Sequence, residues 1–416
     1  MFTIFKGFVA TAVLFMPFAF VKSGWGFSGS ALVVSLILVL YSISMLLAVY
    51  KEVDGGSLPE MGEKTWGKFG KVLTDVLLFS SQFSFCLAYV YFICQQIGGT
   101  FILCVTNSNA TPEGCPAEDG INTTINPTKW IWLVICMAIF TPLVWVRKTE
   151  KFALTHIFAD IMVLVGLIMV TVYATKEIQM NGMKTLSFVT SEFAFSMSYA
   201  VFAFEGVGVV LPIMEITENK EQYFTLLTVT LIVICVIFIA FCEYAAFAYG
   251  EPVFDTSVEP PIQTGGVNAL VLQNLPQNSP VAWVVACLYS LVVVFTYPLQ
   301  ISPANNVLES YLFGGWEKSP KRQWCKNLSR MMVVFVSCAL TIGMYDYISE
   351  LLEIASALTA IPMAFTLPAL FHYKACARSG CAKAIDILFI IGSIVISLYV
   401  TVEGIMTFAK KLEEAK

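Results

Sequence analysis

The sequence has 416 residues, of which 57% are hydrophobic and only 13% are charged, and its mean hydropathy is +0.77. A soluble domain of this size carries about twice that charged fraction, so the composition excludes an ordinary soluble protein. The formal net charge is −5, so the sequence has no excess of basic residues of the kind that binds nucleic acid. We expect no cleavable signal peptide, because the first apolar block reaches spanning length without a small-residue cleavage site.

The apolar residues form long blocks, each close to the roughly 20 residues that a helix needs to cross a bilayer. These blocks predict an all-α polytopic membrane protein with about eleven transmembrane helices in the lipid bilayer. The connector at residues 51–71 is interpreted either as a plain linker or as an interfacial helix. The blocks cover residues 3–22, 27–50, 71–104, 129–146, 152–175, 190–214, 224–249, 280–305, 328–345, 348–371 and 384–408.

The basic residues predict the orientation, because Lys and Arg are enriched in cytoplasmic loops. With the N-terminus inside, sixteen of the 24 Lys and Arg residues fall in inner loops, seven fall in outer segments, and Lys6 lies within the first block. An odd number of helices then places the C-terminus outside or in a lumen. Two glycosylation sequons, at Asn109 and Asn122, fall in the predicted outer loop after the third block. Cys104 and Cys115 flank this loop; they pair if it faces an oxidising compartment and otherwise stay free.

Two of the blocks contain similar interruptions. Each has two small residues one apart, then an apolar stretch, then a proline, and such residues weaken a helix within a membrane. Paired breaks in corresponding positions of two halves are the best sequence indication of a transporter's central binding site. The alternative is a pair of proline-kinked helices without a ligand. The two segments are Ala10-Thr11-Ala12-Val13-Leu14-Phe15-Met16-Pro17 and Glu205-Gly206-Val207-Gly208-Val209-Val210-Leu211-Pro212.

The breaks also indicate the chemistry of the ligand. The N-termini of half-helices present N–H groups to an anion, and unwound carbonyl groups suit a cation, so a zwitterionic amino acid fits both. Gln82, Phe85 and Tyr89 share one face of the third helix and would form part of an apolar wall, with plain core packing as the alternative. The candidate substrate-binding residues are Ala10, Thr11, Ala12, Val13, Leu14, Gln82, Phe85, Tyr89, Phe202, Phe204, Gly206, Val207, Gly208 and Thr296.

Glu205 is the candidate for proton coupling, because an ionisable group inside a membrane is costly and is a functional candidate by default. A purely structural role, in which Glu205 hydrogen-bonds the opened backbone, is the alternative. Glu353 and Asp160 are the other acidic residues deep within blocks. No cysteine or histidine spacing predicts a metal site or a cofactor. With only His156 and His372 in the chain, we do not expect an enzyme.

These residues resemble a known family. The segment Phe202-Ala203-Phe204-Glu205-Gly206-Val207-Gly208-Val209-Val210-Leu211-Pro212 is similar to the sixth-helix signature of proton-coupled transporters in the amino acid/auxin permease family. Three other segments also resemble helices of that family. The first block is similar to its first helix and residues 81–86 to its third helix. Residues 296–303, followed by Glu309, are similar to its eighth helix. The segment Pro298-Leu299-Gln300 and the glycine-rich first inner loop look most similar to vacuolar exporters of neutral amino acids.

The resemblance implies an inverted five-plus-five helix repeat of the LeuT-like type, as in the amino-acid/polyamine/organocation (APC) superfamily, plus one extra helix. The repeats would cover residues 1–175 and 190–371 approximately, and the extra helix residues 384–408. The implied function is secondary active transport of neutral L-amino acids, coupled to protons, by alternating access. The implied location is a vacuolar or lysosomal membrane rather than the plasma membrane. An amino-acid-sensing transceptor of the same fold is the alternative.

Two positions depart from the family pattern. The first break is Ala10-Thr11-Ala12 where the family usually has Gly-x-Gly, and the extra methyl groups would narrow the cleft. Thr3 stands where animal lysosomal and plasma-membrane members carry a histidine, so coupling through that histidine is not expected here.

Overall fold

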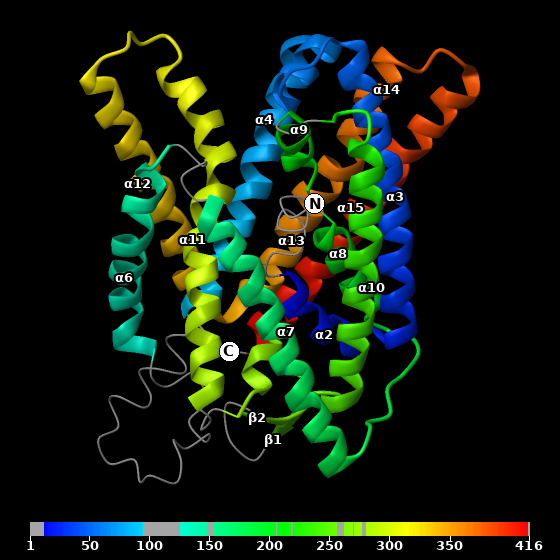
Figure 1. Ribbon diagram of the computed structural model, residues 1–416, viewed down its shortest axis with the longest axis vertical. Coiled ribbons are helices and arrows are strands. Elements are labelled where there is room, and N and C mark those ends of the chain that lie inside the picture. The colour runs from blue at the N-terminus through cyan, green and yellow to red at the C-terminus, as the bar shows by residue number, and fades with distance from the viewer. Residues whose placement is uncertain are drawn as a thin grey trace.

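The apolar blocks fold into long helices that run alongside one another, as Figure 1 shows for the computed structural model. In that view α6 (Ile125–Trp145) and α12 (Pro320–Gly343) lie on one side, and α3 (Trp25–Glu52) and α10 (Tyr223–Tyr249) lie on the other, with α4 (Leu58–Ile93) between them. The structure describes residues 12–94, 125–147, 153–204, 206–215, 217, 219–255, 262–268, 270–276 and 280–414.

The other elements complete the bundle. A short antiparallel ribbon in the connection between α10 and α11 pairs β1 (Val253–Asp255) with β2 (Ile262–Gly265), and the described residues are otherwise helical or irregular. The remaining helices are α2 (Ala12–Ser23), α7 (Ala153–Asn181), α8 (Phe193–Ala203), α9 (Val207–Glu215), α11 (Pro280–Phe313), α13 (Ile348–Ile361), α14 (Leu367–Ala375) and α15 (Gly380–Glu414). The short helical turns are η3 (Val271–Asn274), η4 (Tyr345–Tyr347) and the π-helical η5 (Pro362–Thr366).

The helices match the predicted blocks. Within the described residues, eight helices are long and apolar enough to cross a membrane. Three shorter apolar helices, Val13–Ser23, Ile131–Trp145 and Phe193–Ala203, fall within the first, fourth and sixth blocks. Each of the eleven blocks therefore contains an apolar helix, and the polytopic all-α class is confirmed. The two sequons and the pair Cys104 and Cys115 lie outside the described residues.

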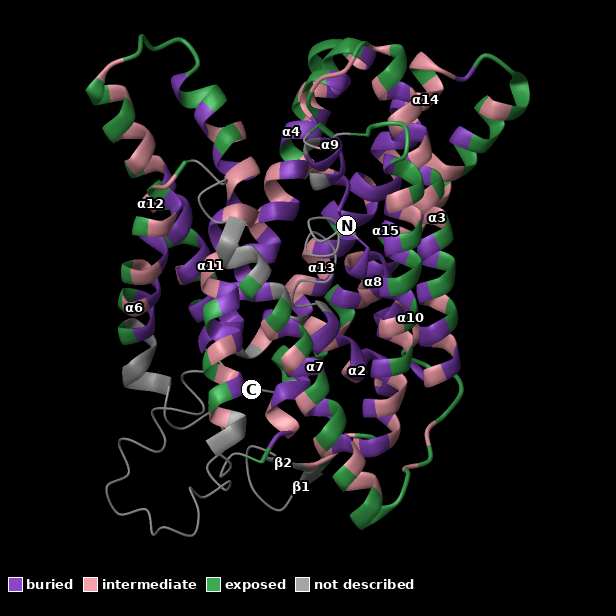
Figure 2. Cartoon of the chain, in the orientation of Figure 1, coloured by how far each residue is buried: buried purple, intermediate pink, exposed green. Residues whose placement is uncertain are grey.

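The outer surface of the bundle is apolar, as expected for a protein surrounded by lipid. Large side chains such as Ile168, Val236 and Leu388 are 61%, 61% and 69% exposed. Figure 2 shows exposed residues repeating along the outer helices while buried ones face the centre. Water would disfavour so much exposed apolar surface, so this surface is fitted to a bilayer.

The connector at residues 51–71 is largely helical. Helix α4 already begins at Leu58, and a φ of 63° at Gly67 interrupts its regular backbone. A Cβ atom on Gly62 would lie 2.7 Å from the carbonyl oxygen of Gly70, so the segments before and after Gly67 lie against each other. The first part of α4 is therefore a separate helical segment, which favours the interfacial helix over the plain linker.

One basic residue assigned to an inner loop is in fact buried. Arg330 is 4% exposed and lies within α12, which begins at Pro320. Its Nε lies 2.6 Å from Oε1 of Glu309, and its Nη1 donates to the carbonyl of Val144 at 2.9 Å. Lys326 reaches the other oxygen of Glu309 at 2.7 Å. This ion cluster joins the ends of α6, α11 and α12.

Candidate functional site

The helix of the sixth block breaks between α8 and α9, as its sequence predicts. Phe204 follows the last residue of α8 with φ −110° and ψ 12°, and its N–H donates to the carbonyl of Val201 at 3.1 Å. Helix α9 then starts, with the N–H of Val210 donating to the carbonyl of Gly206 at 3.0 Å. Glu205 lies inside the break and outside the described residues.

The break predicted in the first block stays a prediction. Helix α2 begins at Ala12, and Ala10 and Thr11 lie outside the described residues, as does the side chain of Ala12. The next two residues, Val13 and Leu14, are fully buried in the core. Any role they have in binding substrate would therefore involve their backbone in this conformation.

Prolines free one carbonyl group near the break between α8 and α9, and one in α2. Proline has no N–H, so the helical bond to the carbonyl four residues earlier cannot form. In α2, Pro17 leaves the carbonyl of Val13 without this partner. In α9, Pro212 does the same for Gly208. Carbonyls released in this way suit a cationic group such as an ammonium.

Helix α4 presents a mixed face to this break. The rings of Phe85 and Phe202 stack with centroids 4.5 Å apart. A Cβ atom on Gly208 would lie 3.5 Å from Nε2 of Gln82, so this side chain approaches the start of α9 closely. Oε1 of Gln82 is buried and has no hydrogen-bond partner among the described residues. Buried polar atoms are normally satisfied, so this oxygen is available to a ligand donor.

Four other candidate residues lie in the packed core or bond within their own helix. Phe204 and Val207 are 0% and 1% exposed and belong to the packed core around the break. Tyr89 is 1% exposed, one turn farther along α4. Thr296 lies on α11, and its hydroxyl donates to the carbonyl of Val292 in the same helix at 2.7 Å. The structure therefore places Tyr89 in the buried core and bonds the hydroxyl of Thr296 within its own helix.

Two apolar residues near the break were missed from the sequence. Leu78 Cδ1 and Met363 Cε lie 3.2 Å and 3.6 Å from the Cβ position of Gly208. Leu78 lies four residues before Gln82 and so shares its helix face, which was a usable signal. Met363 belongs to the π-helical turn η5, and such turns occur often at functional sites. Only Pro362 marked that turn in the sequence.

Serine side chains tie α8 to α2 and to the start of α3. The hydroxyls of Ser28 and Ser196 lie 2.7 Å apart, and that of Ser196 donates to the carbonyl of Ala19 at 3.0 Å. Ser23 donates to the carbonyl of Glu192 at 2.8 Å. These bonds within an apolar bundle hold α8 against α2 and the start of α3.

Glu353 is one of several buried carboxyl groups among the described residues. It lies on α13 and is 6% exposed. Its helix is joined to α8 by the hydroxyls of Ser356 and Ser198, which are 2.8 Å apart. The side chain of Asp160 lies outside the described residues. Among the described residues, no group of three or more His, Cys, Asp or Glu could hold a metal ion.

The fold is shared with a solved transporter structure. The crystal structure of MhsT in complex with L-phenylalanine matches with a TM-score of 0.56, 12% sequence identity and coverage of 97% of both chains. At this identity the match shows the fold alone, and it confirms the LeuT-like fold. The boundaries of the two repeats stay a prediction.

Several curated proteins are similar over most of this chain. Vacuolar amino acid transporter 3 of Saccharomyces cerevisiae is 29% identical, covering 97% of this chain and 56% of the relative. Vacuolar amino acid transporter 3 of Schizosaccharomyces pombe is 25% identical, covering 93% and 55%. Amino acid transporter AVT3B of Arabidopsis thaliana is 26% identical, covering 89% and 83%. The chain thus spans about half the length of these yeast relatives.

The family comparison covers almost the whole chain. Residues 1–406 match the family described as transmembrane amino acid transporter protein, a family of transporters and not of enzymes. The chain belongs to this family.

Proposed function

We propose that this chain is a secondary transporter of neutral L-amino acids that works by alternating access and is coupled to protons. The observation that carries the proposal is the arrangement around Gly208. Pro212 leaves the carbonyl of Gly208 without a helical partner, Nε2 of Gln82 lies 3.5 Å from the Gly208 Cβ position, and the stacked rings of Phe85 and Phe202 join the same two elements, α4 and the broken sixth block.

Each part of this arrangement suits one part of an amino acid. A freed carbonyl and the unpaired Oε1 of Gln82 are acceptors for the ammonium group. The N-terminal end of α9 offers N–H groups and a positive dipole end to the carboxylate. The described side chains around Gly208 are apolar or neutral, which favours a neutral substrate side chain over a charged one.

The coupling proton would be carried by Glu205, whose place in the sequence is between the two half-helices. A carboxyl group there can change its charge while the break faces first one side of the membrane and then the other. Glu353 is the second candidate, because it is buried on a helix that contacts α8 directly.

The proposed location is a vacuolar or lysosomal membrane. The support is that both yeast relatives are named vacuolar amino acid transporters. A transceptor that binds an amino acid and signals is the alternative function, since it would need the same site.

Counterflow in reconstituted vesicles tests the proposal. Vesicles preloaded with unlabelled leucine should accumulate external labelled leucine, and vesicles without protein should not. Preloading with lysine or glutamate should give no accumulation. A protein that binds leucine but gives no counterflow would be a sensor and not a transporter.

A further inference from the structure

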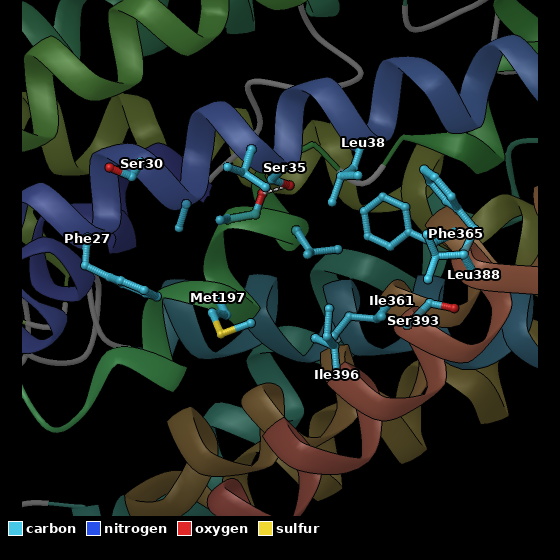
Figure 3. A pocket seen from close by; sticks show the side chains of 16 residues that line it. Phe27, Ser30, Ser35, Leu38, Met197, Ile361, Phe365, Leu388, Ser393 and Ile396 are labelled. Carbon is cyan, nitrogen blue, oxygen red and sulfur yellow. Dashed lines mark hydrogen bonds between the residues drawn. The ribbon is translucent and has the colours of Figure 1, made fainter. Parts of the chain in front are cut away.

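A cavity of about 440 Å³ lies between α3, α8, α15 and the junction of α13 with η5. Figure 3 shows its lining, with side chains from these helices pointing into one space. Its volume falls within the range of about 300–1,000 Å³ that is typical of ligand pockets. It shares no lining residue with the candidate substrate site.

The cavity extends along one face of α3. Its lining on α3 runs from Phe27 to Leu38 at helical spacing, so it follows one face of that helix. At about 1.5 Å per residue, this stretch is roughly 16 Å long. The hydrocarbon core of a bilayer is about 30 Å thick, so the slot matches the reach of one acyl chain through one leaflet.

The lining offers almost no free polar group. Ser30 donates to the carbonyl of Gly26 at 2.7 Å, and Ser35 donates to the carbonyl of Ala200 at 2.9 Å. The hydroxyl of Ser393 lies 2.7 Å from that of Thr366. Each hydroxyl in the lining is already bonded inside the protein, so an apolar occupant leaves no partner unsatisfied.

The mouth of the cavity joins the surface that faces lipid. Leu388 lines the cavity and is itself 69% exposed. Beside it on α15, Ile391 is 56% exposed, and Ile37 on α3 is 60% exposed. The floor is different, because Val201 and Ile361 are only 8% and 1% exposed. A chain from the bilayer can therefore enter at the mouth and reach residues that the surrounding lipid does not touch.

We propose that this cavity holds one acyl chain of a bilayer phospholipid. The occupant contacts Met197 and Val201 of α8, the half-helix that ends at the break. It also contacts Phe365 in the π-helical turn beside Met363. The acyl chain thus packs against the helices that form the candidate substrate site. It would link lipid packing to the position of α8.

Photolabelling in vesicles tests this site. The full chain is reconstituted into phosphatidylcholine that carries a diazirine near the methyl end of one acyl chain, and labelled peptides are mapped by mass spectrometry. We expect label on Val201 and Ile361 as well as on lipid-facing Ile37. Label confined to lipid-facing residues would overturn the proposal, whatever the transport activity.

A cavity-filling variant gives the matched comparison. A Cβ atom on Gly392 would meet nothing within 4 Å, so the ring in Gly392→Phe can occupy the cavity. Label on Val201 and Ile361 should then be lost while label on Ile37 remains. Ile391→Phe adds a ring on the lipid-facing side of the same helix and should change nothing.

A second filling variant guards against misfolding of the first. Ala31→Phe fills the same cavity from α3 and should cause the same loss. Unchanged floor labelling in both filling variants would contradict the proposal. A photoactivatable sterol that labels the floor and displaces the phospholipid probe would assign the cavity to a different occupant.

Discussion

Phe85 of α4 and Phe202 of α8 stack with ring centroids 4.5 Å apart and planes inclined by 26°. The contact joins the part of α4 after Gly67 to the half-helix that ends at the break. An aromatic pair of this kind contributes about 0.5–1.5 kcal/mol beyond its buried area. If α8 moves relative to its neighbours during the proposed alternating access, this stack would border the proposed substrate site and would have to rearrange in each cycle.

We therefore predict coupled effects of Phe85→Ala and Phe202→Ala on leucine uptake. Each single variant should raise KM, and the double variant should raise it by less than the product of the two changes. Phe79 and Phe83 form another stacked pair on α4, with centroids 5.9 Å apart, and Phe79→Ala should leave KM unchanged. Fully multiplicative effects of the two substitutions would show that the stack does not couple these residues.

Gly208 should tolerate a methyl group poorly and a larger side chain not at all. A Cβ atom there would lie 3.2 Å from Leu78 Cδ1 and 3.5 Å from Gln82 Nε2, which is tight but can be relieved by small shifts. We expect Gly208→Ala to retain reduced transport and Gly208→Leu to abolish it by filling the space beside the freed carbonyl. Gly343→Leu is the control, since nothing lies within 4 Å of that Cβ position. A well-folded Gly208→Leu protein with normal transport would place the site elsewhere.

The sequence was informative wherever a local rule decided the structure. Small residues and Pro212 predicted the break between α8 and α9, and spacing placed Gln82 and Phe85 on one face of α4. The sequence indicated Phe85 and Phe202 as candidates but did not predict that their rings stack, because the two residues lie far apart in the chain.

Other features depend on long-range packing and gave no local signal. The hydroxyl pair of Ser28 and Ser196 spans 168 positions, and serines in apolar helices are common enough to pass unnoticed. Likewise, the sequence predicts Arg330 as a basic residue of an inner loop, and only its pairing with Glu309 explains why it is buried. The approach of Met363 to Gly208 depends on how the tenth block packs against the sixth.

Arg330→Met should destabilise the protein strongly. Removing one partner of a buried ion pair costs about 3–5 kcal/mol, because the remaining charge stays buried. Arg378 pairs with Glu52 at 3.1 Å, but its side chain is 85% exposed, so Arg378→Met should cost about 1 kcal/mol or less. Thermal unfolding in the same detergent compares them, and equal Tm values for both variants would contradict the structural role of the cluster.

The orientation of the chain can be checked directly. The asymmetry of basic residues predicts that the N-terminus lies in the cytosol and that Lys416 lies outside or in a lumen. A tag after Lys416 should be protected from protease in sealed vacuole-type vesicles and should be cut after detergent is added. Accessibility of this tag from the cytosolic side alone would reverse the assignment.

The final prediction separates the two candidate carriers of the coupling proton. If Glu205 binds and releases the proton, Glu205→Gln should behave as a permanently protonated form. Uptake driven by a pH gradient should collapse, while exchange of labelled for unlabelled leucine should survive, because exchange requires no deprotonation step. A residue that only braces the break would lose both activities on substitution, or neither.

Glu353→Gln provides the matched comparison, since it makes the same chemical change at the second candidate, whose side chain is buried on α13. If Glu205 is the carrier, Glu353→Gln should retain both gradient-driven uptake and exchange. The opposite pattern, with undiminished gradient-driven uptake in Glu205→Gln and selective loss of it in Glu353→Gln, would move the proton to α13. The Ser356 and Ser198 contact, 2.8 Å across, would then be the direct path from that carboxyl's helix to α8.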